Sequence, residues 1–380
     1  MKKVLAIAPY SYLPYFSGGQ KFIALFFEHL GREVDLTVVS VKENDFSLAK
    51  NYKTIPLLKK SFSRYLDAGL AARIISLVKT EKFDIIIWEH PYYAWLAYKV
   101  KKQTGITTII QTHNIEYQRF KTLGRWWWPI LKVYEKWFFQ FADFIFFITA
   151  TDKKFAVEHW NLPAHKAIDV PFGIEVDEHP KDKDHCKQLL RTRHKIREDE
   201  TILLFNGVLD YKPNLDALMV ILEKINPVLL SHQSFKYKIL ICGKRLPAEL
   251  NELREYKDKN IIYTGFVNDI ETYFKGADLF LNPVQTGGGI KTKMVEAIGF
   301  GTTVIATEIG AVGINRSICG NKLVIIDGSN WADFAAAIIS HANESSITPA
   351  AYYHYYNWKD IVSNAIKVLS DHTTSKLINQ

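Results

Sequence analysis

Three consecutive glycines, two lysines and a glutamate lie within eleven positions in the second half of the sequence. Residues 286–297 read TGGGIKTKMVEA and follow an apolar run at 277–283. Glycine lets a backbone approach an anion closely, and a helix N-terminus presents unpaired N–H groups to it. A carboxylate about two turns into that helix is a natural bidentate partner for the two hydroxyls of a ribose. This pattern predicts a site for a nucleoside diphosphate, or for a sugar attached to one. The candidate donor-binding residues here are Gly287, Gly288, Gly289, Lys291, Lys293 and Glu296.

The length of 380 residues favours two domains, because one hydrophobic core rarely extends over so long a chain. The sequence has no run of about 18 uncharged apolar residues, and the strand-like 4–8 is too short for the core of a signal peptide. Three widely spaced cysteines with no CxxC favour neither a disulfide framework nor a zinc site. We therefore expect a cytoplasmic protein with reduced cysteines and no membrane-spanning helix.

The net charge of +8 leaves several partners open, among them nucleic acid, an anionic membrane surface and an anionic substrate. Basic residues and tryptophans alternate in 119–139, which suits the headgroup zone of an anionic membrane on the inner face. The alternative is that these aromatic side chains pack in a core or between domains. Nucleic acid is not expected as a partner, because no recognition motif accompanies these residues.

Strand-like and helical patterns alternate along both halves of the chain, which predicts α/β domains with parallel, doubly wound sheets. We expect a linker at the start of the charged stretch 175–197 and a cleft between two similar domains, with ligands at the carboxyl ends of the strands. The predicted strands are 3–8, 33–41, 84–88, 107–112 and 142–149 in the first half, and 201–205, 237–242, 260–263, 278–281, 303–306 and 323–326 in the second; 18–30 is predicted as a helix.

Several short motifs occur in an order and spacing that resemble those of a known family. They read PYFSGGQ at 14–20, HNIE at 113–116, FNGVLDYKPN at 205–214, ICGK at 241–244, GFVND at 265–269, the glycine motif at 286–297, and TVIAT followed by GAVG at 303–313. Together they resemble the glycosyltransferases of the two-domain GT-B type, and within them glycosyltransferase family 4, the group 1 glycosyltransferases. The resemblance covers nearly the whole chain.

The resemblance implies a division into three parts. Residues 1–172 form an acceptor-side Rossmann-like domain, residues 173–350 form a Rossmann-like domain that binds the nucleotide sugar, and residues 351–380 form a helical end that crosses back to the first domain. It also implies that Gly287, Gly288, Gly289 and Glu296 hold the diphosphate and the ribose.

Further site residues follow from the same resemblance. The nucleobase is expected at Phe266 and Val267, and Gly18 and Gly19 are expected to approach the diphosphate and the sugar. His113 is expected beside the sugar or the acceptor as the candidate catalytic residue. The alternative is that His113 is a hydrogen-bonded structural histidine. The pair Glu89–His90 is a further candidate at a strand end.

Two positions depart from the common family pattern. Many members carry an acidic residue eight positions before the ribose glutamate, where this chain has Gly288, and an arginine where it has Val208. We expect a lysine to replace that charge, with Lys291 preferred because it is next to the glycine turn. The other candidates are Lys293, Lys212 and Lys244.

The resemblance implies transfer of a sugar from a nucleoside diphosphate to a glycan or lipid-linked acceptor in polysaccharide or glycoconjugate synthesis. We expect retention of anomeric configuration and no cofactor. We also expect no metal, because the only DxD, at 182–184, lies in a charged stretch that we interpret as solvated surface. The alternatives are an epimerase or phosphorylase of the same architecture, and a non-catalytic sugar-nucleotide-binding partner of an active homologue. A dinucleotide oxidoreductase is excluded, since no GxGxxG follows the first strand.

Overall fold

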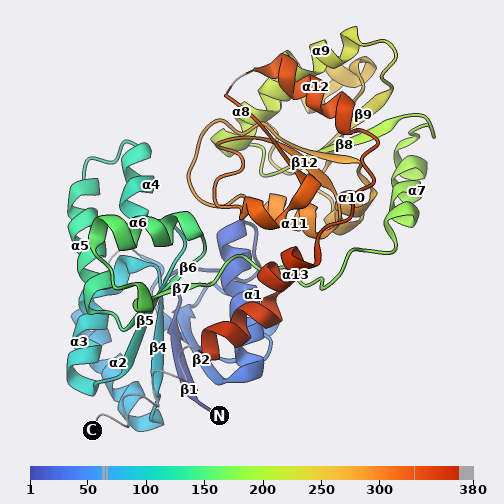
Figure 1. Ribbon diagram of the computed structural model, residues 1–380. Coiled ribbons are helices and arrows are strands. Elements are labelled where there is room, and N and C mark those ends of the chain that lie inside the picture. Colours follow the sequence, from blue (N-terminus) through green and yellow to red (C-terminus); the bar gives the residue numbers. More distant parts are fainter. Residues whose placement is uncertain (62–64, 66, 329, 368–380) are drawn as a thin grey trace. The chain divides into compact units, whose positions relative to one another are not determined.

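The computed structural model describes residues 1–61, 65, 67–328 and 330–367, and the chain divides into two compact α/β units (Figure 1). The first unit contains Met1–Gly173 and the segment from Tyr356 onward, and the second contains Ile174–Tyr355. Each unit is built around its own parallel sheet.

The sheet of the first unit has seven parallel strands in the order β3-β2-β1-β4-β5-β6-β7. The chain runs outward from β1 to β3, returns to β4, and then continues outward in the other direction. The strand order therefore reverses between β1 and β4, which is the position where open α/β sheets bind their ligands. The strands are β1 (Lys3–Ile7), β2 (Asp35–Val41), β3 (Lys53–Leu58), β4 (Ile85–Glu89), β5 (Thr107–Thr112), β6 (Phe144–Phe147) and β7 (Ala167–Asp169).

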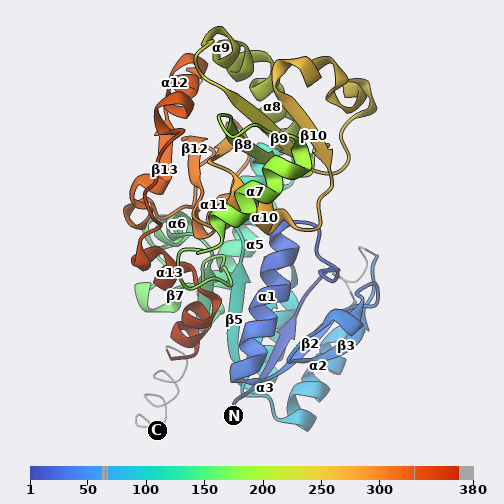
Figure 2. The same cartoon turned by 90° about the vertical axis from the view of Figure 1, so that its right-hand side faces the viewer.

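Helices cover both faces of this sheet. Apolar side chains of α2, α3, α5 and α6 pack with those of β1, β2 and β4 to β6 in one continuous core, and α1 lies along the opposite face (Figures 1 and 2). The helices are α1 (Gly18–Glu33), α2 (Ala68–Glu81), α3 (Ala94–Thr104), α4 (Glu116–Thr122), α5 (Trp128–Phe141) and α6 (Ala150–Trp160), with short 3₁₀ turns η1 (Phe46–Leu48), η3 (Pro91–Tyr93) and η4 (Ala164–Lys166).

Short polar side chains fix where several of these helices begin. The side chain of Ser17 accepts a hydrogen bond from the backbone N–H of Gln20 at the start of α1, and Asp67 and Thr149 do the same at the starts of α2 and α6. Each of these N-caps satisfies a backbone donor that has no partner within the helix.

The second unit has six parallel strands in the order β10-β9-β8-β11-β12-β13. The reversal of strand order here lies between β8 and β11. The strands are β8 (Thr201–Asn206), β9 (Tyr237–Cys242), β10 (Ile261–Gly265), β11 (Leu279–Asn282), β12 (Thr303–Thr307) and β13 (Leu323–Ile326). The helices are α7 (Lys183–His194), α8 (Lys212–Val220), the π-helix η5 (Ile221–Ile225), α9 (Asn226–Ser231), α10 (Ile270–Gly276), α11 (Thr292–Gly299), α12 (Trp331–His341) and α13 (Ala350–Tyr356), with η6 (Ala248–Lys259), η7 (Arg316–Ile318) and η8 (Gly320–Lys322).

The predicted fold class, two Rossmann-like doubly wound α/β domains, is confirmed by these two sheets. The sequence did not reveal β3 and β7, which are the two edge strands of the first sheet. β3 contains Pro56 and is mostly exposed or half-buried, so it lacks the continuous apolar pattern of a central strand.

The charged stretch 175–197 is not a linker along its whole length, because it contains α7, which packs on α10 in the second unit. Asp182 forms an ion pair with Lys275 at 3.0 Å, and Asp184 is exposed. The Lys183 ammonium between them donates to the backbone oxygens of Lys275 and Phe300. Lys183 therefore anchors α7, and only the flanking carboxylates match the expectation of a solvated surface.

Candidate functional site

The glycine loop of the second unit follows β11, directly beside the reversal of strand order. Gly287 and Gly289 have φ angles of 95° and 71°, which L side chains rarely adopt. Gly288 has no such angle, and a Cβ atom placed on it would meet no other atom within 4 Å. Two of the three glycines are thus required by the backbone, while the third leaves open space beside the loop.

The Lys291 ammonium binds the glycine loop itself. Its Nζ donates to the carbonyl oxygens of Gly287, Gly288 and Gly289 at 3.3, 3.4 and 2.8 Å. Burial lowers the pKa of Lys291 to about 8. The residue that we expected to replace the family's arginine therefore fixes the shape of the loop.

Lys293 joins α11 to the end of β8, across the reversal of strand order. Its Nζ donates to the backbone oxygen of Asn206 at 3.0 Å and to Oδ1 of Asn214 at 3.2 Å. The ammonium lies 4.8 Å from the ring centroid of Phe205. Burial, with a smaller effect of the nearby Lys291 charge, lowers the pKa of Lys293 to about 7. A positive charge held this deep is stabilised by an anion that reaches the loop.

The backbone at the ends of β8 and β9 is too crowded for side chains. A Cβ atom on Gly207 would lie 2.7 Å from Nδ2 of Asn214, and one on Gly243 would lie 2.0 Å from the backbone oxygen of Gly207. These glycines bring two strand ends together next to Lys293. Glu296 is half-buried on α11, within the same unit.

The remaining candidate residues of the second unit lie on exposed loops and helix starts. The Phe266 side chain is 63% exposed, and the Lys244 ammonium lies 5.9 Å from the centroid of its ring. Val267 is half-buried beside it. Lys212 forms an ion pair with Asp216 at 2.9 Å on an exposed helix face.

In the first unit the structure brings the glycine pair to His113. Gly18 and Gly19 are the first two residues of α1, and His113 follows β5. A Cβ atom on Gly19 would lie 3.6 Å from Nδ1 of His113. Two residues that are far apart in the sequence therefore meet at the carboxyl end of the sheet.

His113 is held by Glu89, at the end of β4. Nε2 of His113 lies 2.9 Å from Oε2 of Glu89, and both side chains are almost completely buried. Burial raises the pKa of Glu89, although the hydrogen bond with His113 opposes this shift. Oε1 of Glu89 has no hydrogen-bond partner among the described residues. Glu89 thus fixes the orientation of the His113 ring and leaves its Nδ1 toward Gly19.

His90 stacks on His113 and connects the ends of β1, β4 and β5. The two rings lie 4.2 Å apart, Nε2 of His90 lies 2.5 Å from the Tyr10 hydroxyl, and Nδ1 lies 3.3 Å from Oε1 of Glu116. His90 has φ 64° and ψ 161°, a conformation that non-glycine residues adopt at a cost in free energy. Burial lowers its pKa to about 4, so the ring is neutral near pH 7.

Glu116 is the most strongly hydrogen-bonded carboxylate of this network. It accepts from the Tyr92 hydroxyl at 3.0 Å and pairs with Arg119 at 3.2 Å. Burial alone would raise its pKa, but hydrogen bonds from His90 and Tyr92 and the Arg119 charge lower it to about 2. Glu116 joins the network of the first unit.

Sequence reasoning missed three members of this network, Tyr10, Tyr92 and Glu135. Tyr10 follows β1 and Tyr92 follows β4, so their place after strand ends was a signal. Glu135 lies in the middle of α5, where a glutamate gives no signal. Its two carboxyl oxygens accept from the backbone N–H groups of Glu116 and Tyr117 at 2.8 and 3.0 Å.

No group of three or more metal-ligating His, Cys, Asp or Glu side chains occurs within the described ranges. The same part of the chain holds no helix that combines the length and the apolar character needed to cross a bilayer.

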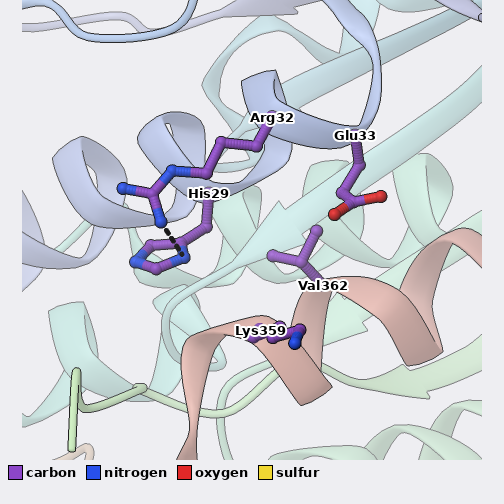
Figure 3. A pocket seen from close by; sticks show the side chains of 5 residues that line it. All are labelled: His29, Arg32, Glu33, Lys359 and Val362. Atoms are coloured by element: carbon purple, nitrogen blue, oxygen red, sulfur yellow. Dashed lines mark hydrogen bonds between the residues drawn. The ribbon is translucent and has the colours of Figure 1, made fainter.

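A shallow pocket elsewhere in the first unit is unrelated to these sites. It is lined by His29, Arg32 and Glu33 from the last turn of α1 and by Lys359 and Val362 (Figure 3). Because α1 has 16 residues, this pocket lies about 15 Å or more along the helix from Gly18 and Gly19.

Two doubly wound domains, with a glycine loop at the strand reversal of the second one, define the GT-B class of fold. Two family models match the two halves of the chain. The "Glycosyltransferase Family 4" model matches residues 16–178, and the "Glycosyl transferases group 1" model matches residues 200–344. The chain therefore belongs to the group 1 and family 4 glycosyltransferases.

Individual relatives are distant. The chain is 23% identical over its whole length to an uncharacterised 44.6 kDa protein of the cps region of Klebsiella pneumoniae, of which it covers 98%. Among solved structures, Anabaena Alr3699/HepE in complex with UDP-glucose has a TM-score of 0.70 at 14% identity, with 98% of this chain and 100% of that chain covered. The lipopolysaccharide outer core galactosyltransferase WaaB has a TM-score of 0.67 at 13% identity, with 97% and 99% covered.

Proposed function

We propose that this glycosyltransferase transfers a sugar from a nucleoside diphosphate to a glycan or lipid-linked acceptor in the synthesis of a surface polysaccharide or glycoconjugate. One observation carries the donor assignment, namely the glycine loop together with Lys293, which is held at the strand reversal of the second domain. The cps-region relative and the UDP-glucose complex of a structural neighbour support the substrate class.

The donor diphosphate binds against the glycine loop and the start of α11. Gly287 and Gly289 turn the backbone so that it approaches the phosphates closely, and the charges of Lys291 and Lys293 lie directly behind the loop. Glu296 accepts from the ribose hydroxyls, because an ionised carboxylate pairs with two vicinal donors. Phe266 and Val267 provide the edge for the nucleobase, with the exposed Phe266 ring beside Lys244.

The chemistry needs stabilisation of a leaving diphosphate more than it needs a nucleophile. Lysines and backbone N–H groups in a partly dry site stabilise the charge that develops as the glycosidic bond breaks. We propose that a leaving phosphate oxygen takes the proton of the acceptor hydroxyl, with retention of configuration and without a metal. His113, oriented by Glu89, contacts the sugar or the acceptor. The three buried free cysteines are those of a reduced, cytoplasmic protein.

Calorimetry with a panel of nucleoside diphosphates and their sugars tests the donor site. We expect binding of one nucleotide class and a loss of at least about tenfold in affinity for Glu296→Ala, since a hydrogen bond to a charged group contributes roughly 1.5–3 kcal/mol. Glu223→Ala removes an exposed carboxylate of the same unit and is the matched control. Absence of binding to every nucleotide, or equal affinity of Glu296→Ala and the parent, contradicts the proposal.

Donor turnover then separates the transferase from a protein that only binds nucleotide sugars. The departures at Gly288 and Val208 are the observations that favour a silent binder. We expect turnover that depends on a lipid-linked or glycan acceptor, continues in the presence of a chelator, and gives a product with the donor's anomeric configuration by NMR. Loss of turnover on chelation, or an inverted product, overturns the proposed mechanism.

A further inference from the structure

The outer layer formed by α3, α4 and α5 exposes basic side chains and no acidic side chain of its own, and Lys101 pairs with Asp143, just beyond α5, at 2.6 Å. Between positions 94 and 141 the only acidic residues are Glu116 and Glu135, and both are fully buried. The basic residues of this stretch are Lys99, Lys101, Lys102, Arg119, Lys121, Arg125, Lys132 and Lys136. Every exposed charged side chain of this stretch is therefore positive.

Four large apolar side chains are exposed at the end of α4 and on α5. Leu123, Trp126, Ile130 and Val133 are 57%, 82%, 66% and 70% exposed. Ile130 and Val133 are three residues apart and lie on one side of α5, and Trp126 lies in the turn that precedes this helix. We call these four residues, with Lys121 and Arg125, the α4–α5 face.

The interpretation of this tryptophan-rich segment as domain packing holds for Trp127 and Trp128. Trp127 packs on Phe120 with ring centroids 4.6 Å apart, and Trp128 packs on Tyr117 at 6.1 Å. These two tryptophans belong to the domain's own packing. Packing within the domain therefore explains Trp127 and Trp128, and it leaves the 82% exposure of Trp126 unexplained.

We propose that the α4–α5 face docks on a bilayer that contains anionic phospholipid. Tryptophan and aliphatic side chains insert at the level of the headgroups, while lysine and arginine beside them pair with lipid phosphates. A single exposed apolar residue is ordinary, but four together with only basic neighbours match an anionic lipid surface in both polarity and charge.

The position of this face within the first unit fits an acceptor held by a lipid. α4 begins at Glu116, in the network that holds His90, and its seven residues extend about 10 Å to the start of the exposed segment. The sugar of a lipid-linked acceptor at the headgroup level is therefore within reach of His113. This step rests on the proposed function, whereas the docking itself needs no donor.

Vesicle sedimentation with the full-length protein tests the docking. We expect binding to vesicles of phosphatidylglycerol and phosphatidylcholine, and much weaker binding to phosphatidylcholine alone. The triple variant W126S/I130S/V133S should bind about tenfold or more weakly at any salt concentration. The double variant K121Q/R125Q should bind roughly tenfold or more weakly at low salt only, because salt screens exposed charges.

The matched control is the triple variant L48S/L230S/I347S, which removes three exposed apolar side chains elsewhere and should bind as the parent does. Circular dichroism should show the same melting for all variants, since the altered side chains are exposed. Equal binding of W126S/I130S/V133S and the parent overturns the proposal. Equal binding to neutral vesicles overturns it as well. Absence of any vesicle binding also overturns it, and the face is then assigned to a protein partner.

Turnover links the face to the acceptor. W126S/I130S/V133S should lose activity on a lipid-linked acceptor in vesicles and keep it on a water-soluble fragment of that acceptor. Equal loss on both acceptors contradicts a role of the face in presenting the lipid. Absence of turnover by the parent on both contradicts the transferase function instead, and the sedimentation result still decides whether the face docks.

Discussion

Gly287 and Gly288 are neighbours in the glycine loop, but a methyl group has different consequences at each. At Gly287 the φ angle of 95° is strained for any L side chain, and the new Cβ atom would lie 3.4 Å from Cγ of Pro213. We expect Gly287→Ala to cost roughly 1–3 kcal/mol and to weaken nucleotide binding. Gly288→Ala should change stability by less than about 0.5 kcal/mol. Urea unfolding and calorimetry measure both, and equal effects of the two substitutions would show that the loop conformation is not strained at Gly287.

In the proposed mechanism Glu89 acts on the reaction through His113. Glu89→Gln keeps the size of the side chain, but its amide no longer fixes the same hydrogen bond to Nε2 of His113. We expect kcat to fall about tenfold to a hundredfold with little change in the KM for the donor, and the pH profile of kcat to shift because the partner of His113 has changed. Steady-state kinetics across pH check this. A variant with the parent's kcat and pH profile would reduce Glu89 to a packing residue.

Lys293 makes nucleotide binding depend on pH. Burial lowers its pKa to about 7, so above that pH the ammonium loses its proton in the free protein. A bound diphosphate favours the charged form, so binding takes up a proton and the affinity falls as the pH rises above 7, by at most about tenfold per pH unit for one proton. Lys291, with a pKa of about 8, adds to the effect at higher pH.

Calorimetry between pH 7 and 9 should show that Lys293→Gln flattens this dependence. Lys224→Gln, at an exposed position of η5, should keep the slope of the parent. If Lys293→Gln retains the full slope, the anion does not act on Lys293.

At the level of elements, one helix caps another. Glu135 of α5 accepts from the first two backbone N–H groups of α4, which otherwise have no partner within the helix. Glu135→Ala leaves these buried donors unsatisfied, and we expect a loss of about 1–3 kcal/mol in the free energy of unfolding. Glu135→Gln keeps one acceptor oxygen and should lose less.

Urea unfolding measures these losses, with Gln140→Ala on the exposed side of α5 as the control. Hydrogen exchange should also accelerate in α4 when Glu135 is replaced. An unchanged exchange rate in α4 would argue that the cap does not hold this helix in place.

At the level of the whole molecule, the C-terminal segment completes the core of the first unit. Trp358 is fully buried, with ring centroids 5.4 Å from Phe22 and 6.0 Å from Phe172, and a Cβ atom on Gly173 would lie 2.3 Å from its indole. Trp358→Ala should destabilise the first unit by roughly 3–5 kcal/mol, because it removes a large buried side chain.

Urea unfolding monitored by circular dichroism should show two transitions, one for each unit. Trp358→Ala is expected to shift the transition of the first unit and to leave that of the second, because Trp358 belongs to the first unit and not to the core cluster of the second. Lys359→Ala, an exposed neighbour, is the control. A shift of the second transition alone would contradict this assignment.

The fold class was predictable because central parallel strands are buried on both faces and read as continuous apolar runs. β5, β9 and β13 have the predicted bounds. The edge strand β3 escaped detection because it buries little, and β7 because it has only three residues. His113 and the glycine pair were predictable from their places after strands. Tyr10 and Tyr92 also follow strand ends and carry the same signal, whereas Glu135 was not predictable, because its role depends on backbone groups 18 and 19 residues away.

The sequence by itself determined where backbones turn and which residues supply charge, since glycine conformation and apolar periodicity act over a few residues. Only the tertiary structure decided which of those residues meet. The order of strands determines which residues meet, because it places the ends of β1, β4 and β5 together in one sheet and the ends of β8 and β11 together in the other. It turned Lys291 toward the loop carbonyls, brought Lys293 to the end of β8, and left Trp126 exposed while Trp127 and Trp128 pack half-buried against the core.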